Sequence, residues 1–303
     1  MARVPRSGII TKMDYSNQNN GLTMLAVLAH PDDETFGMGG TLALYARRGV
    51  SVHLICATRG EVGEVEPRFL EGYQSIGDLR ENELRCAAEK LGLEGVHFLD
   101  YRDSGMKGSP DNEHPQALAA APIDEVAAKV TAYIRKLRPQ VVLTFDPIGG
   151  YRHPDHVAIH EATRRAFEAA GDAQVYPGEY PPFQPDKLYY HTFPRGWLTW
   201  VVRLMPLIGK DPRRFGQNGD IDLLELVGEN FPVHARIDYG EVVRVKEAAT
   251  ACHASQGSMA TSSGLMRWAF RLASGKDSFT RAYPQPEGRL KERDLFTGVN
   301  SSS

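Results

Sequence analysis

LAVLAHPDDETFGMGG, residues Leu25–Gly40, passes from a buried strand into a cluster of polar side chains. The apolar run Met24–Ala29 is typical of a strand that is covered on both faces of a parallel sheet. Residues 30–34 (HPDDE) then place one imidazole and three carboxylates next to one another. Clustered carboxylates raise one another's pKa, and a bound cation removes that penalty. Because open α/β sheets bind ligands at the carboxyl ends of their strands, this stretch predicts a metal site there.

Strand and helix patterns alternate along the segments that follow. The strongest helical segment begins after Pro122, carries Asp124 and Glu125 in its first turn, and shows one apolar face. Further strands are expected at Val50–Ala57, Val96–Leu99, Val141–Phe145 and Lys187–Thr192, and further helices at Thr41–Arg48, at 84–91 and at Val157–Ala170. The alternation predicts an α/β fold with a Rossmann-like, doubly wound, mostly parallel sheet.

We expect a single domain over residues 22–303, with a core at 22–171, a C-terminal elaboration at 172–299, and a flexible tail at 1–21. Two tryptophan-bearing segments, Trp197–Ile208 and Leu265–Leu272, have the pattern of amphipathic helices. We interpret them as packing over the sheet or forming a subunit interface, in preference to contacting a membrane. The sequence therefore leaves a homo-oligomer as one possibility. No motif indicates the roles of residues 195–230 and 257–299.

The amino-acid composition indicates a globular protein and argues against some classes of partner. Of the 303 residues, 24% are charged and 42% hydrophobic, as in ordinary globular proteins. The net charge of −3 and the lack of a basic cluster argue against a nucleic-acid partner. The longest apolar stretch is too short for a membrane span, and we expect neither a signal peptide nor a location outside the cytoplasm.

The three cysteines, Cys56, Cys86 and Cys252, are widely spaced and odd in number. They form neither a CxxC pair nor a disulfide framework, and this usage suits a reducing compartment. We therefore expect each of them to be a small buried hydrophobic residue.

A second polar turn, HPDH at 153–156, follows the strand predicted at Val141–Phe145. A catalytic zinc site needs three nitrogen or oxygen ligands and one position for water, and His30, Asp33 and His156 supply such a set. Asp32 and His153 then lie beside the ion, where their residue types suit a general base and a general acid.

Other interpretations of these turns exist. The Asp of either turn could be a helix N-cap. The glycines of GMGG at 37–40 do not form the GxGxxG pattern of a dinucleotide site. Two histidines and a carboxylate also describe the facial triad of non-haem Fe(II) oxygenases, although those enzymes usually carry it on antiparallel barrels. A non-catalytic sugar-binding module is the alternative outside catalysis.

AHPDDE near the N-terminus and GGYRHPDH more than a hundred residues later resemble the PIG-L/LmbE family of zinc-dependent N-acetylglucosaminyl deacetylases. TRGEVGE, YRDSGM and the late K-x-x-A-x-x-x-H-x-S-Q at Lys246–Gln256 are similar to further family segments. The branch that it resembles most deacetylates glucosamine precursors of mycothiol or bacillithiol. A sister branch hydrolyses amides of thiol S-conjugates.

The resemblance implies a role for each matching position. His30, Asp33 and His156 would bind Zn²⁺, with Fe²⁺ as the other metal to consider. Asp32 would be the base and His153 the acid, held by Asp155, and Tyr151 would reach the carbonyl oxygen. The pocket for the small-molecule amino-sugar conjugate would be lined by Arg59, Glu64 and Asp103. The expected reaction is hydrolysis of the N-acetyl group to acetate and a free amine.

Overall fold

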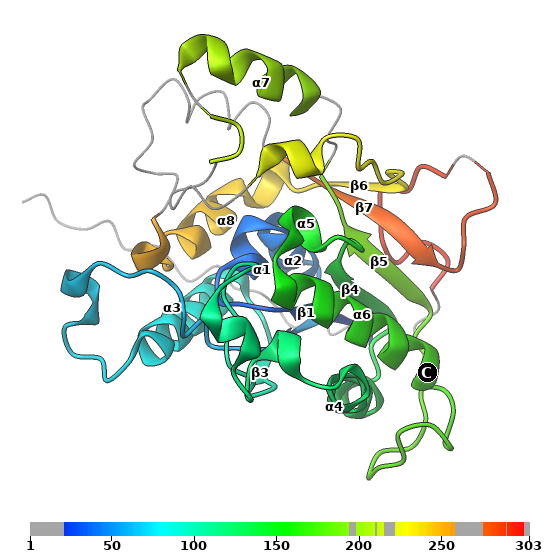
Figure 1. Cartoon of the computed structure of the whole chain (residues 1–303). Helices are drawn as coiled ribbons and strands as arrows, with labels where there is room; N and C mark the ends of the chain where they lie inside the picture. The colour runs from blue at the N-terminus through cyan, green and yellow to red at the C-terminus, as the bar shows by residue number, and fades with distance from the viewer. Residues whose placement is uncertain are drawn as a thin grey trace, which may run out of the picture.

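The computed structural model describes residues 21–193, 198–209, 211–214, 222–257, 275–288 and 290–299. The predicted tail up to residue 20, Trp197 and the predicted helix Leu265–Leu272 lie outside the described residues. Figure 1 shows a central sheet with helices packed on both of its sides.

One sheet of seven strands, in the order β3-β2-β1-β4-β5-β7-β6, runs through the described residues. The strands from β1 to β5 are parallel to their neighbours, and β7 runs antiparallel to both β5 and β6. The strand bounds are β1 (Thr23–Leu28), β2 (Ser51–Cys56), β3 (Gly95–Phe98), β4 (Val141–Phe145), β5 (Lys187–His191), β6 (Ala235–Asp238) and β7 (Lys276–Tyr283). The predicted doubly wound, mostly parallel α/β fold is confirmed.

Helices cover the two faces of this sheet. On one face α4 packs against α6, and on the other α2, α3 and α8 pack together. The helix bounds are α1 (Asp33–Phe36), α2 (Gly39–Arg47), α3 (Ile76–Leu91), α4 (Ile123–Leu137), α5 (Gly149–Arg152), α6 (Pro154–Ala169), α7 (Leu198–Leu204) and α8 (Val243–Thr250). Because both faces are covered, β1 and β4 are buried along almost their whole length, as their apolar sequences predict.

The predicted elements of the first 171 residues all form, with bounds shifted by a few residues. The turn that closes α3 needs Gly92, which has a φ of 78°. The long connection from Tyr101 to Ala121 contains two short 3₁₀ turns. The short helices α1 and α5 were not predicted, and neither were β6, α8 and β7 of the C-terminal third, where β7 adds an antiparallel edge to the parallel sheet.

The segment around α7 lies over the carboxyl end of β4. Val202 and Met205 form a small apolar cluster with Leu223 and Leu226 of a 3₁₀ turn, and this cluster packs on Ile148 and Tyr151. In Figure 1, α7 projects from the body of the molecule. The described part of the Trp197–Ile208 segment therefore packs on the turn after β4 through Val202 and Met205, while Trp200 and Leu207 are exposed, and the predicted subunit interface stays a prediction.

The expectation of three separate thiols is wrong for two of the cysteines. Cys86 of α3 and Cys252, just after α8, form a disulfide, whereas Cys56 is a buried free thiol. The two half-cystines lie 166 residues apart in sequence, so their spacing alone gave no sign of the pairing. The bond fixes the end of α8 to α3.

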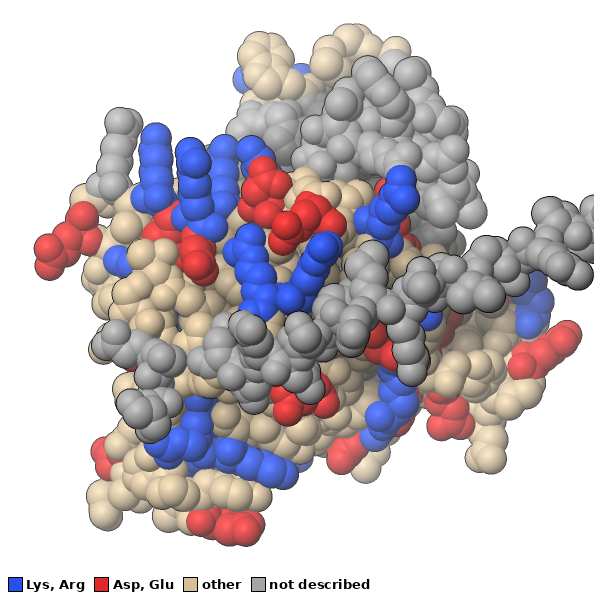
Figure 2. All heavy atoms as spheres, turned by 180° about the vertical axis from the view of Figure 1, so that it is seen from behind, with Lys and Arg blue, Asp and Glu red and all other residues tan. Residues whose placement is uncertain are grey.

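Surface charge agrees with the composition. On the face opposite to that of Figure 1, Lys and Arg side chains are interspersed with Asp and Glu (Figure 2). Among the described residues, no helix is both long enough and apolar enough to cross a bilayer.

Candidate active site

The two polar turns leave the sheet at the point where its strand order reverses. β1 lies between β2 and β4, so the chain winds away from β1 in both directions. The HPDDE turn follows β1, and α5 with the HPDH turn follows β4, which is the neighbour of β1. Ligands of open α/β sheets bind at this switch point, because the first turns after the two strands face the same space.

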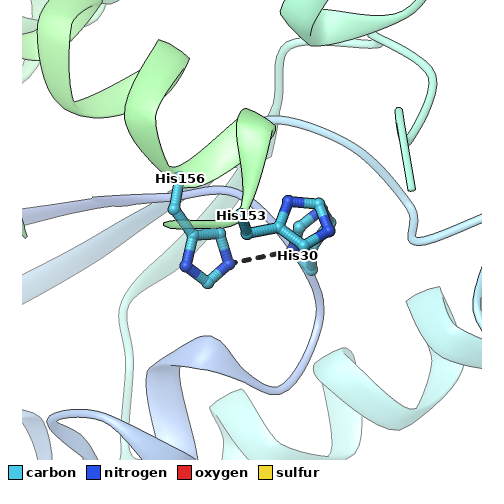
Figure 3. Close-up of side chains that lie close together, drawn as sticks. All are labelled: His30, His153 and His156. Atoms are coloured by element: carbon cyan, nitrogen blue, oxygen red, sulfur yellow. Dashed lines mark hydrogen bonds between the residues drawn. The ribbon is translucent and has the colours of Figure 1, made fainter. Parts of the chain in front are cut away.

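Two imidazole nitrogens face each other at this switch point (Figure 3). Nδ1 of His30 lies 3.2 Å from Nε2 of His156. The other nitrogen of each ring meets an acceptor: Nε2 of His30 is 2.9 Å from a carboxylate oxygen of Asp155, and Nδ1 of His156 is 3.1 Å from the carbonyl oxygen of Gly149. Because a carboxylate and a carbonyl oxygen only accept hydrogen bonds, the hydrogen lies on Nε2 of His30 and on Nδ1 of His156. In the neutral rings, the two facing nitrogens therefore both carry lone pairs. Burial acts to lower the pKa of His30, but Asp103, Asp155 and Asp33 raise it well above the ordinary value, so that without a cation His30 Nδ1 can donate a proton to His156 Nε2.

The Asp33 carboxylate completes a set of three donors. Its Oδ1 lies 3.3 Å from His156 Nε2, and its Oδ2 lies 3.6 Å from His30 Nδ1. Ligands 2.0–2.1 Å from a tetrahedral zinc ion stand about 3.3 Å apart. Each Asp33 oxygen is thus near this spacing from one histidine nitrogen, whereas the three ligand atoms that all lie within 4.8 Å of one another in the described residues belong to His30, His153 and His156.

His153 lies beside this donor set and belongs to a wider group. Its ring nitrogens come within 4.8 Å of those of His30 and His156, and a second group of this kind joins His30 and His153 to Asp103 and Asp155. Nδ1 of His153 accepts the backbone N–H of Asp155, 3.2 Å away, as the N-cap of α6. That bond leaves the ring hydrogen on Nε2.

Electrostatics favour a neutral His153. Burial lowers its pKa to about 2, and the neighbouring His30 and His156 act in the same direction. The pKa of His156 is also lowered, by burial and then by His30. A His153 that is protonated at rest, as a general acid would be, does not agree with these surroundings.

Asp32 has a strained backbone and a tightly held side chain. Its φ of 118° lies in the left-handed region, which costs a non-glycine residue about 1–3 kcal/mol. Arg80 Nη2 donates to Asp32 Oδ2 at 3.1 Å and also to the carbonyl oxygen of Pro31 at 2.6 Å. Burial raises the pKa of Asp32 to about 7, in opposition to Arg80.

Asp155 orients His30 from behind. Its fully buried carboxylate accepts the His30 ring N–H, the Ser104 hydroxyl, and the Ser104 backbone N–H at 3.0 Å. Asp103 lies 3.5 Å from the same His30 nitrogen and is also buried. Burial acts to raise the pKa of Asp103, but the charge and hydrogen bond of His30 bring it well below its usual range.

Tyr151 comes from α5 and closes one side of the cluster. Its ring contacts those of His153 and His156 edge-on, with centroids 6.0 and 5.0 Å apart. Burial, followed by the charges of Asp33 and Asp32, raises the pKa of its phenol well above the usual value. The phenol thus keeps its proton and is a hydrogen-bond donor beside His153 and His156.

Comparison with known proteins identifies the chain. Residues 25–167 match the model of the family described as PIG-L: GlcNAc-PI de-N-acetylase. A 1D-myo-inositol 2-acetamido-2-deoxy-alpha-D-glucopyranoside deacetylase from Geodermatophilus obscurus is 38% identical over 242 residues, which cover 77% of this chain and 82% of that relative. This chain belongs to the PIG-L family. It is an enzyme of this deacetylase family, and the predicted resemblance is confirmed.

Solved structures share the PIG-L fold of this chain. N,N'-diacetylchitobiose deacetylase from Pyrococcus horikoshii aligns with a TM-score of 0.60 and 19% identity, covering 91% of each chain. GalB, a 4-carboxy-2-hydroxymuconate hydratase from Pseudomonas putida, aligns with a TM-score of 0.56 and 21% identity, covering 89% of this chain and 99% of GalB. Since the neighbours include a hydratase, the fold alone does not specify the reaction.

Of the three residues predicted to line the sugar pocket of this PIG-L chain, one lies in the histidine cluster and two lie away from it. Asp103 lies in the cluster, whereas Arg59 is directed at Glu81 and Asp100, at 2.6 Å each. Glu64 is exposed, and among the described residues neither it nor Arg59 forms a hydrogen bond or an ion pair with the histidines. The geometry thus provides no support for Arg59 and Glu64 as residues of the sugar pocket.

Residues that sequence reasoning missed support the site from behind. Arg80, Ser104, Glu34 and His253 are buried and bond to site residues or to one another. Arg80 had a signal, because it stands four residues before Leu84 and so lies on the apolar face of α3. A charged residue on a buried face needs a partner, and here the partner is Asp32.

Proposed function

We infer that this PIG-L chain hydrolyses the N-acetyl group of an N-acetylglucosaminyl conjugate, with zinc held by His30, Asp33 and His156. The observation that carries the inference is the spacing of three donor groups: His30 Nδ1 lies 3.2 Å from His156 Nε2, and the Asp33 carboxylate oxygens lie 3.3 and 3.6 Å from these two nitrogens. The named activity of the Geodermatophilus relative, on a glucosaminyl inositol, supports an amino sugar joined to a small polar aglycone. Such a sugar would be a precursor of a low-molecular-weight thiol.

Zinc, when bound, supplies a Lewis acid and lowers the pKa of a water from 15.7 toward about 7. Asp32 is the group placed to take the proton of the attacking water. Its carboxylate is held by Arg80 and lies in the turn that also carries His30 and Asp33. Once the C–N bond breaks, the departing amine needs a proton, and the protonated Asp32 can return the one that it took.

His153 and Tyr151 act on the carbonyl oxygen in this scheme. The His153 ring hydrogen is on Nε2, since Nδ1 accepts from Asp155, and the Tyr151 phenol retains its proton. Two donors aimed at the oxygen where negative charge develops are typically worth about 3–4 kcal/mol each. We thus assign His153 the role of a neutral donor, in place of the general acid expected from its residue type.

Of the residues predicted to bind substrate, Asp103 is the one that lies beside the histidines. It is an acceptor for sugar hydroxyls beside His30, and its low pKa keeps it ionised. Tyr151 packs against the apolar cluster under α7, and in this proposal that cluster contacts the aglycone.

Acetate release from a panel of N-acetylglucosaminides that differ only in the aglycone tests the proposal. We expect zinc-loaded protein to favour an inositol-like aglycone and Asp32→Asn to lose at least about 100-fold in kcat. Cleavage of thiol S-conjugate amides without acetate release would favour the sister activity. Oxygen uptake by iron-loaded protein would favour an oxygenase, and full activity in Asp32→Asn would overturn the mechanism.

A further inference from the structure

A buried histidine far along the chain touches the acidic turn. His253 follows α8 and is fully buried, and its Nε2 lies 2.6 Å from Oε1 of Glu34. Glu34 is also fully buried and is the last acid of the HPDDE turn. Neither residue has a part in the proposed chemistry, although the segment that contains His253 carries one of the motifs found in the sequence.

The other oxygen of Glu34 holds the backbone of Asp32. Its Oε2 accepts the Asp32 N–H at 2.9 Å, while the Asp32 carbonyl accepts the N–H groups of Thr35 and Phe36 at 3.0 and 2.9 Å. Asp32 thus keeps its φ of 118° while both its backbone N–H and its backbone carbonyl are hydrogen-bonded. Since a non-glycine residue leaves this region when its neighbours allow, the Glu34 carboxylate must stay in place.

His253 is what fixes that carboxylate. A buried carboxylate needs a donor for each oxygen, and among the described residues the donors to the Glu34 carboxylate are the Asp32 N–H and His253 Nε2. The turn that bears His253 is in turn fixed to α3, because Ser255 bonds to Glu83 through its backbone N–H at 2.8 Å and its hydroxyl at 2.7 Å. The Cys86–Cys252 disulfide anchors the same turn.

We propose that His253 is a positioning residue for the base Asp32, acting through the Glu34 carboxylate. The chain of contacts runs from α3 through the turn after α8 to Glu34, and from Glu34 to the backbone of Asp32. Its effect is to hold the Asp32 carboxylate at a fixed place relative to His30 and Asp33. The catalytic consequence rests on the proposed function, whereas the structural consequence is measured without it.

The structural arm measures amide hydrogen exchange at Asp32 by NMR in metal-free protein. In His253→Ala, Glu34 loses its second donor, so we expect the Asp32 amide to exchange at least about tenfold faster than in the wild type. His253→Gln offers an amide N–H in place of Nε2 and should restore most of the protection. Ser255→Ala is the matched control, since it removes only the hydroxyl bond while the backbone N–H bond to Glu83 still fixes the turn, and it should leave the Asp32 amide protected.

The catalytic arm measures kcat, KM and bound zinc for the same variants. We expect His253→Ala to lower kcat by about 10- to 100-fold with KM and zinc content unchanged, because a misplaced base costs rate and not binding. A merely structural role would lower the melting temperature of His253→Ala and Ser255→Ala alike and would leave kcat intact. Added to Glu34→Gln, His253→Ala should cause no further loss, and additive losses would contradict a route through Glu34.

The two proposals fail in different ways. If Asp32→Asn loses deacetylation while His253→Ala keeps full kcat and slow exchange at Asp32, the positioning role is wrong and the proposed function stands. If Asp32→Asn keeps deacetylation, the proposed mechanism is wrong, and the exchange measurement still decides whether His253 holds the Asp32 backbone.

Discussion

Nδ1 of His30 and Nε2 of His156 lie 3.2 Å apart although 126 residues separate them in sequence. When both rings are neutral, each gives its hydrogen to the acceptor behind it, and the pair presents two lone pairs to the same point. Two lone pairs at this distance repel unless a proton or a cation lies between them. The sheet topology brings them together, because their turns follow the adjacent strands β1 and β4.

Single substitutions should distinguish the residues that bind zinc from the residues that only lie beside it. We expect His156→Ala and Asp33→Ala to bind zinc at least about 100-fold more weakly, since each removes one of three protein ligands. His153→Ala should retain about one zinc per chain, because its Nδ1 is engaged by the Asp155 N–H. Zinc per chain after dialysis against a graded chelator is the measurement, and loss of zinc from His153→Ala would move His153 into the ligand set.

Gly149 should be essential for the placement of His156. Its φ is +64°, and a Cβ there would lie 2.7 Å from the His156 Cβ. Gly149→Ala would therefore displace the ring and weaken zinc binding by about 10- to 100-fold, as loss of the groups that orient a ligand usually does. Gly150→Ala is the matched control, since Gly150 has a φ of +70° but open space around it. Equal losses in the two variants would mean that backbone strain is the cause, and not the contact with His156.

The sequence predicted the parallel half of the sheet, because each strand there is an apolar run that ends in a polar turn. It also predicted that His30, Asp33, His153 and His156 would meet, since polar turns after neighbouring parallel strands share an edge. The partners behind them, Arg80, Glu34 and His253, depend on which helix face meets which turn, and spacing does not specify this. The same holds for Arg59, whose motif predicted the sugar pocket but whose side chain pairs with Glu81 and Asp100.

The Cys86–Cys252 disulfide determines how many free thiols the protein should have. Denatured protein without reductant should titrate one thiol, that of Cys56, and reduced protein should titrate three. The Cys86→Ser, Cys252→Ser double variant should unfold with a free energy about 2–5 kcal/mol lower, because the bond closes a long loop in the unfolded chain. Three thiols titrating without reductant would contradict the pairing.

His160 should make the folded state sensitive to acid. The residue lies on α6, is 5% exposed rather than on the helix surface, and holds the Phe145 carbonyl oxygen at 2.8 Å through Nδ1. Burial lowers its pKa below the ordinary value of 6.5, so the folded state resists the proton that the unfolded state accepts. The stability that His160 contributes is therefore fully present above pH 6.5 and is lost as the pH falls below it.

The measurement is the free energy of unfolding by denaturant between pH 7.5 and 5 in metal-free wild type and in His160→Gln. Below pH 6.5 the wild type should lose up to about 1.4 kcal/mol per pH unit more than the variant, which has no group to titrate at this position. Other histidines titrate equally in both proteins, so the difference in slope belongs to His160. Parallel curves would show that His160 takes up its proton as readily in the folded state as in the unfolded one.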